Sequence, residues 1–128
     1  MKRKEKFHIE YVFDKVSNHS LWNHLTTPMG LSAWFADEVN IGRDTCTFTW
    51  NKTVEEAEIV FIRPETAVRY RWLNDEDRPF YFEFRIHNFE LTGATSLEIT
   101  DFAEPDEKAD AITLWDSQVD ELKRSLGI

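Results

Sequence analysis

Apolar and polar residues alternate along several stretches of the chain, as in strands that bury one face. Near the start, residues 7–13 place Phe7, Ile9, Tyr11 and Phe13 on one side. The clearest alternation follows Pro79 and has the apolar residues Phe80, Phe82, Phe84 and Ile86. Because successive side chains of a strand point to opposite faces, every second residue of these stretches is predicted to face a core.

Between these two stretches and beyond them, turn residues divide the chain into further short strands. Residues 42–44, 51–52, 63–65 and 92–93 carry the turn signals, among them a proline that cannot donate to a strand ladder. The strands that they delimit cover residues 45–50, 54–62, 66–73 and 94–102. The polar run at residues 74–79 is predicted to be a solvated loop.

Three helices are predicted, two of them short and directly after the first strand. Ser17 is a suitable N-cap for a helix through Leu25, because its hydroxyl can accept a backbone N–H of the first turn. Thr27 and Pro28 give a second start signal, since the fixed φ of proline suits the first helical position. The chain ends in a long helix whose apolar stripe is Ile112, Trp115, Val119, Leu122 and Leu126.

This order of elements predicts an α+β fold in one domain, residues 1–128. Consecutive strands with short connections pair antiparallel, and a helix with a single apolar stripe packs on the apolar face of the sheet. We therefore expect a curved antiparallel sheet of six to seven strands around the C-terminal helix. A curved sheet cannot contact a straight helix everywhere, so a space is expected between them near the two short helices.

Residues 21–36, LWNHLTTPMGLSAWFA, resemble the signature of START-like (SRPBCC, helix-grip) domains. The similarity is greatest to the Aha-type activators of the heat-shock-protein ATPase, which also have a tryptophan and leucine stripe in the last helix, here Trp115, Leu122 and Leu126. The resemblance implies a helix-grip fold. The resemblance does not single out one function, because the superfamily includes lipid and hormone carriers, polyketide cyclases and co-chaperones.

The charge of the chain narrows the range of partners. There are 15 Lys and Arg residues against 24 Asp and Glu residues, and the formal net charge is −9. Such a field repels phosphate backbones, so nucleic acid is not an expected partner. No stretch approaches the roughly 20 apolar residues of a membrane span, and no apolar signal segment follows the charged N-terminus, so a cytoplasmic location is expected.

Patterns typical of catalysis or metal binding are missing from the sequence. His19 and His24 are separated by about 140° around a helix axis, which does not suit a shared metal. Glu56 and Glu58 alternate with inward apolar residues and are predicted on the outer face of the sheet. Cys46 is the single cysteine and has no partner for a disulfide. We therefore predict no catalytic residue, metal ligand or cofactor, and a non-enzymatic role is favoured.

Aromatic residues make up 14% of the chain and are the strongest functional candidates. Those predicted to point inward from separate elements are Trp34, Phe35, Trp50, Tyr70, Trp72, Phe82, Phe84 and Trp115. They either fill the core or, in part, line a cavity for a small molecule. In the second case the hydroxyls of Tyr70 and Tyr81, or an indole N–H, would orient the ligand.

The leading functional hypothesis is a START-like domain that binds a small hydrophobic or lipid-like molecule between the sheet and the C-terminal helix. One alternative is a protein-interaction module of the Aha-type co-chaperone kind, with a chaperone as its partner. Another is a cyclase-like enzyme of the same fold, which would need an inward-facing polar residue. The oligomeric state is left open by the sequence.

Overall fold

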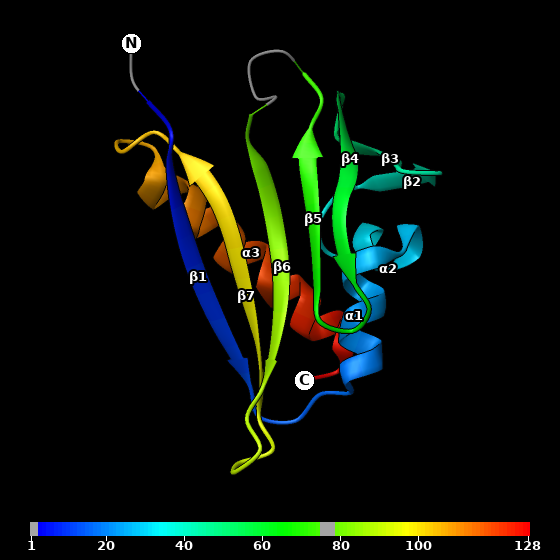
Figure 1. The fold of residues 1–128 in the computed structure, drawn as a ribbon, viewed down its shortest axis with the longest axis vertical. Helices are drawn as coiled ribbons and strands as arrows, with labels where there is room; N and C mark the ends of the chain where they lie inside the picture. Colours follow the sequence, from blue (N-terminus) through cyan, green and yellow to red (C-terminus); the bar gives the residue numbers. More distant parts are fainter. Residues whose placement is uncertain (1–2, 75–78) are drawn as a thin grey trace.

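A curved antiparallel sheet packs against three helices in the computed structural model, which describes residues 3–74 and 79–128 (Figure 1). Within these residues the seven strands are β1 (Glu5–Phe13), β2 (Glu38–Gly42), β3 (Thr45–Trp50), β4 (Thr53–Arg63), β5 (Ala67–Trp72), β6 (Tyr81–Asn88) and β7 (Thr95–Ala103). The helices are α1 (Asn18–Thr26), α2 (Pro28–Ser32) and α3 (Lys108–Leu126). The predicted α+β fold is confirmed.

The strand order is β1-β7-β6-β5-β4-β3-β2, so the first strand pairs with the last. Every other neighbouring pair is consecutive in sequence, as short connections require. Figure 1 shows α3 crossing behind the sheet, with α1 beside its C-terminal end and α2 packed next to α1 and β2. The predicted loop at residues 74–79 lies mostly outside the described residues.

The two short helices begin where the capping signals predicted. The Ser17 hydroxyl accepts the Ser20 N–H at 3.2 Å, and the Thr27 hydroxyl accepts the Gly30 N–H at 2.9 Å. Gly30 also brings α2 close to α1, because a Cβ added at this position would lie only 2.2 Å from the Asn23 carbonyl oxygen. The junction of the two helices therefore requires glycine.

The inner face of the sheet carries the predicted apolar rows. Phe84 and Ile86 of β6 and Ile99 of β7 are at most 4% exposed. The stripe on α3 faces them, with Trp115, Val119 and Leu122 buried and Ile112 and Leu126 partly buried. The apolar rows of the strands, which repeat every two residues, and the apolar stripe of α3, which follows the helical period of about 3.6, thus pack together in one core.

The outer face of the sheet is charged, as predicted. Glu58 pairs with Arg71, while Glu83 accepts from Arg69 at 2.9 Å and from Arg85 at 3.3 Å. Only 6% of Glu83 is exposed, because the two arginines cover it. Cross-strand pairs of opposite charge each stabilise a sheet by about 0.2–1 kcal/mol.

Two aromatic predictions were wrong at the start of β6. Phe80 does not join the inward row, because it precedes the strand and packs against Phe102 with ring centroids 5.1 Å apart. Tyr81 lies on the outer face, as its place in the alternation predicts, and the Arg69 guanidinium is 4.1 Å from its ring centroid, so the predicted role of its hydroxyl in orienting a ligand was wrong. Its hydroxyl is therefore not a cavity group.

Candidate functional site

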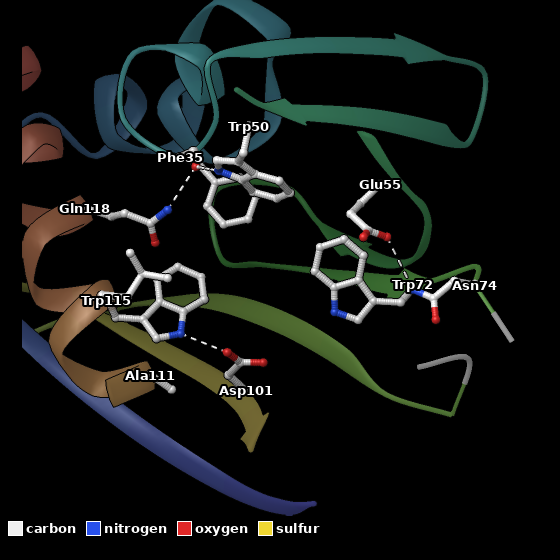
Figure 2. Close-up of a pocket in the computed structure, with 10 residues that line it drawn as sticks. Phe35, Trp50, Glu55, Trp72, Asn74, Asp101, Ala111, Trp115 and Gln118 are labelled. Carbon is white, nitrogen blue, oxygen red and sulfur yellow. Dashed lines mark hydrogen bonds between the residues drawn. The ribbon is translucent and has the colours of Figure 1, made fainter. Parts of the chain in front are cut away.

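A pocket of about 530 Å³ lies between the sheet and the N-terminal half of α3 (Figure 2). Four aromatic residues from four different segments line it: Phe35, Trp50, Trp72 and Trp115. Ala111 and Leu114 of α3 add apolar surface. The polar residues at the pocket are Glu55, Asn74, Asp101 and Gln118.

The aromatic walls contact one another as well as the pocket. The Phe35 ring stacks on Trp115 with a centroid separation of 5.7 Å and an interplanar angle of 19°. The rings of Trp50 and Phe35 pack edge to face with centroids 5.3 Å apart, and the centroids of Trp72 and Phe82 are 5.1 Å apart. Such contacts hold each ring in one orientation.

The other four predicted aromatic residues are supports rather than walls. Trp34, Tyr70, Phe82 and Phe84 are at most 5% exposed and do not line the pocket. The Tyr70 hydroxyl donates to the Leu25 carbonyl at 2.6 Å, and burial raises the pKa of Tyr70. This hydroxyl thus joins the sheet to α1 and does not point to a ligand. The structure therefore brings all eight residues to one region and divides them between a wall and the core behind it.

Hydrogen bonds to one backbone carbonyl tie three segments together at the edge of the pocket. The Phe35 carbonyl accepts from the Trp50 indole at 2.6 Å and from the Gln118 amide at 2.9 Å. Figure 2 shows these groups converging from β3, α3 and the segment after α2. The Phe35 carbonyl thus positions the Trp50 indole and also anchors α3 through Gln118.

Asp101 places a carboxylate in the pocket wall beside Trp115. One carboxylate oxygen accepts the Trp115 indole N–H at 2.9 Å, and the other accepts the Phe102 backbone N–H at 2.8 Å. At the far side of Trp72, Glu55 accepts from the Asn74 amide at 3.4 Å (Figure 2). The pocket therefore combines indole walls with two carboxylates.

The polar lining residues were missed by the sequence reasoning, although their spacing held the signal. Asp101 continues the inward row of Leu97 and Ile99 on β7, with the same period of two. Gln118 is three residues after Trp115, and therefore shares its side of α3. The period of a strand or helix assigns polar residues to a face as well as apolar ones, so the inward positions of Asp101 and Gln118 can be predicted from sequence.

The histidines lie away from the pocket. His8 bonds Thr100 at 2.8 Å and His87 lies 3.5 Å from Glu98, both pairs on the sheet. His19 is 3.2 Å from Glu65, and His24 is 2.7 Å from Ser125. In residues 3–74 and 79–128 there is no group of three or more His, Cys, Asp or Glu side chains that could hold a metal ion. None of the described helices has the length and apolar character needed to cross a membrane.

A seven-stranded sheet curved around a C-terminal helix, with a pocket between them in the described part of the chain, defines a helix-grip domain. The family model described as the START-like superfamily domain matches residues 1–128, and the chain belongs to this superfamily. A search of curated proteins gave no match.

Solved structures agree with this assignment. BfR322 from Bacteroides fragilis is 46% identical, with a TM-score of 0.69 and coverage of 98% of this chain and 92% of that protein. The Aha1 dimer from Colwellia psychrerythraea has a TM-score of 0.82 at 20% identity, covering 97% of each chain. CalU16 from Micromonospora echinospora has a TM-score of 0.71 at 18% identity, covering 93% of this chain and 74% of that one.

Proposed function

We propose that this domain binds a small hydrophobic or lipid-like molecule in the pocket between the sheet and α3. The observation that carries the proposal is a space of about 530 Å³ faced by three indole rings and one phenyl ring. Small-molecule sites commonly measure about 300–1,000 Å³ and combine apolar walls with a few polar groups. Burying an apolar ligand there would contribute roughly 25 cal/mol per Å² of apolar surface removed from water.

The first test is native mass spectrometry of the protein purified from its own cells, where a reproducible bound mass is expected. A direct binding test uses naphthalen-1-ylmethanol, a neutral aromatic probe, in isothermal titration calorimetry. Ala111→Phe places a ring in the pocket, and we expect it to abolish probe binding because Ala111 lines the wall.

The matched control is Ala109→Phe, which adds the same ring at an exposed position of the same helix. This variant should bind the probe like the unaltered protein. Unchanged binding by Ala111→Phe, with both variants folded by circular dichroism, would place the bound probe outside the pocket and contradict the proposal.

A cyclase-like enzyme is the second candidate, because Asp101 supplies the inward-facing polar group that such an enzyme needs. The expected signature is that Asp101→Asn still binds naphthalen-1-ylmethanol but no longer converts any polyketide-type substrate that the unaltered protein cyclises. Support for a co-chaperone role is weaker. Most of the large apolar residues of the Aha-like motif, among them Leu21, Trp22 and Leu31, are buried and explain the fold, and Met29 is the large apolar residue of the motif that is exposed, at 85%.

A further inference from the structure

Three residues line two neighbouring hollows of the protein. Phe35, Trp50 and Gln118 border the aromatic pocket, and they also border a second hollow of about 300 Å³. The rest of the second hollow is lined by residues 32–37, which end α2 and lead into β2, and by Glu121 of α3. The two spaces therefore share one boundary.

Two side chains that bond to one backbone carbonyl form this boundary. The Trp50 indole and the Gln118 amide donate to the Phe35 carbonyl at 2.6 and 2.9 Å (Figure 2). The indole is also fixed by its neighbours, because its ring packs with Phe35, Phe48 and Trp72 at centroid separations of 5.3, 5.8 and 6.4 Å. Such ring contacts hold the Trp50 side of the boundary in place.

Gln118 is the side of the boundary that can move. Its side chain is half-buried, and its amide is held by the hydrogen bond to the Phe35 carbonyl. Breaking one neutral hydrogen bond shifts a conformational equilibrium by roughly two- to tenfold, which leaves a rotated Gln118 accessible. The Phe35 carbonyl keeps the Trp50 indole as a donor when Gln118 rotates, so no buried acceptor is left unpaired.

We propose that Gln118 is a gating residue and that the aromatic pocket and the second hollow together bind one elongated ligand, an apolar body with a flexible chain that ends in a polar group. This inference rests on the proposed function, because it extends the same pocket. The apolar body lies against the aromatic rings, the chain passes Gln118, and the polar end reaches residues 32–37. Among these, the Ser32 hydroxyl donates to the Met29 carbonyl at 3.0 Å and can still accept a hydrogen bond.

Two neutral probes that differ in chain length test the connection: naphthalen-1-ylmethanol and 6-(naphthalen-1-yl)hexan-1-ol. NMR of protein with ¹³C-labelled alanine methyl groups reports where each probe lies, because Ala111 lines the aromatic pocket and Ala33 lines the second hollow. We expect the short probe to shift the Ala111 methyl and not that of Ala33. The long probe should shift both with one dissociation constant, and the exposed Ala109 is the control that neither probe should shift.

Two variants should change the affinity of the long probe in opposite directions, so a general loss of structure cannot imitate both. Ala33→Phe fills the second hollow and should weaken the long probe by about tenfold, whereas Met29→Phe is its control because it adds the same ring at a position that is 85% exposed. Gln118→Ala should tighten the long probe by roughly two- to tenfold, since the bond to Phe35 no longer has to break, and Ser117→Ala is its exposed control. The short probe should stay within about twofold in all four variants.

The outcomes separate the two proposals. A long probe that shifts Ala111 and leaves Ala33 unchanged overturns the inference and leaves the proposed function standing. A shift of Ala33 by the short probe, or with a dissociation constant different from that of Ala111, also overturns it, because the second hollow then binds independently. Equal affinity of the long probe for the unaltered protein and for folded Ala33→Phe has the same meaning. If neither probe shifts Ala111, the proposed function fails together with the inference.

Discussion

Replacing Trp72 with alanine measures how far the pocket is open. One side of this ring packs on Phe82, with centroids 5.1 Å apart, and the ring centroids of Trp72 and Phe48 are 6.2 Å apart. The other side faces the pocket. Truncating a fully buried large aromatic residue to alanine costs about 3–5 kcal/mol, so a ring with one packed side should cost about 2 kcal/mol.

Phe84→Ala is the comparison, because Phe84 is 0% exposed and contacts rings on several sides, among them Trp34 at 5.4 Å and Phe82 at 5.4 Å. We expect it to lower the free energy of unfolding by about 4 kcal/mol, although phenylalanine is the smaller side chain. Urea denaturation followed by far-ultraviolet circular dichroism reports both values without depending on tryptophan fluorescence. If Trp72→Ala costs as much as Phe84→Ala, the ring is packed on all sides and the pocket is closed in solution.

Two further predictions concern the packing of the fold. Gly30→Ala should destabilise the protein by about 3 kcal/mol in urea denaturation, because the new Cβ would meet backbone atoms of α1 that cannot move aside. Gly42→Ala has no atom within 4 Å of the new Cβ and should change stability by less than about 0.5 kcal/mol, and equal effects of the two changes would contradict the clash. Burial raises the pKa of the Cys46 thiol from 9.0 to about 11, so the unfolded chain loses this proton first as the pH rises. Between about pH 9 and 11 the free energy of unfolding of the unaltered protein should therefore fall by about 2–3 kcal/mol more than that of Cys46→Ala. An equal fall in both proteins, measured by urea denaturation across this pH range, would refute the raised pKa of Cys46.

The local signals of the sequence predicted the elements well. Ser17, Thr27 and Pro28 act within one turn of helix, and the positive φ of 54° at Asn51 is confined to a two-residue hairpin. Such signals depend on atoms a few residues apart, which is why they can be read without knowing the fold.

The strand β4 shows where alternation stops being informative. The sequence predicts one continuous strand over residues 54–62, and β4 is continuous, but its register with β5 shifts between Ile59 and Phe61. At the shift Val60 is 45% exposed, and beyond it Phe61 and Ile62 are 39% and 52% exposed. A bulge inserts one extra residue and so changes which face the later residues occupy. Nothing in these apolar residues themselves indicates that change.

The sequence by itself determined the order of elements, the α+β class and the set of aromatic residues that face inward, because the two periods assign each side chain to a face. Only the tertiary structure decided which of them line a pocket. Phe82 and Trp72 both point inward, yet one is covered by neighbouring rings and the other borders open space. That difference arises from the curvature of the sheet against α3, which brings together residues as distant as Phe35 and Gln118. The period of a strand or helix predicts toward which face each side chain points. How deeply that side chain is buried depends on the other elements that pack over it.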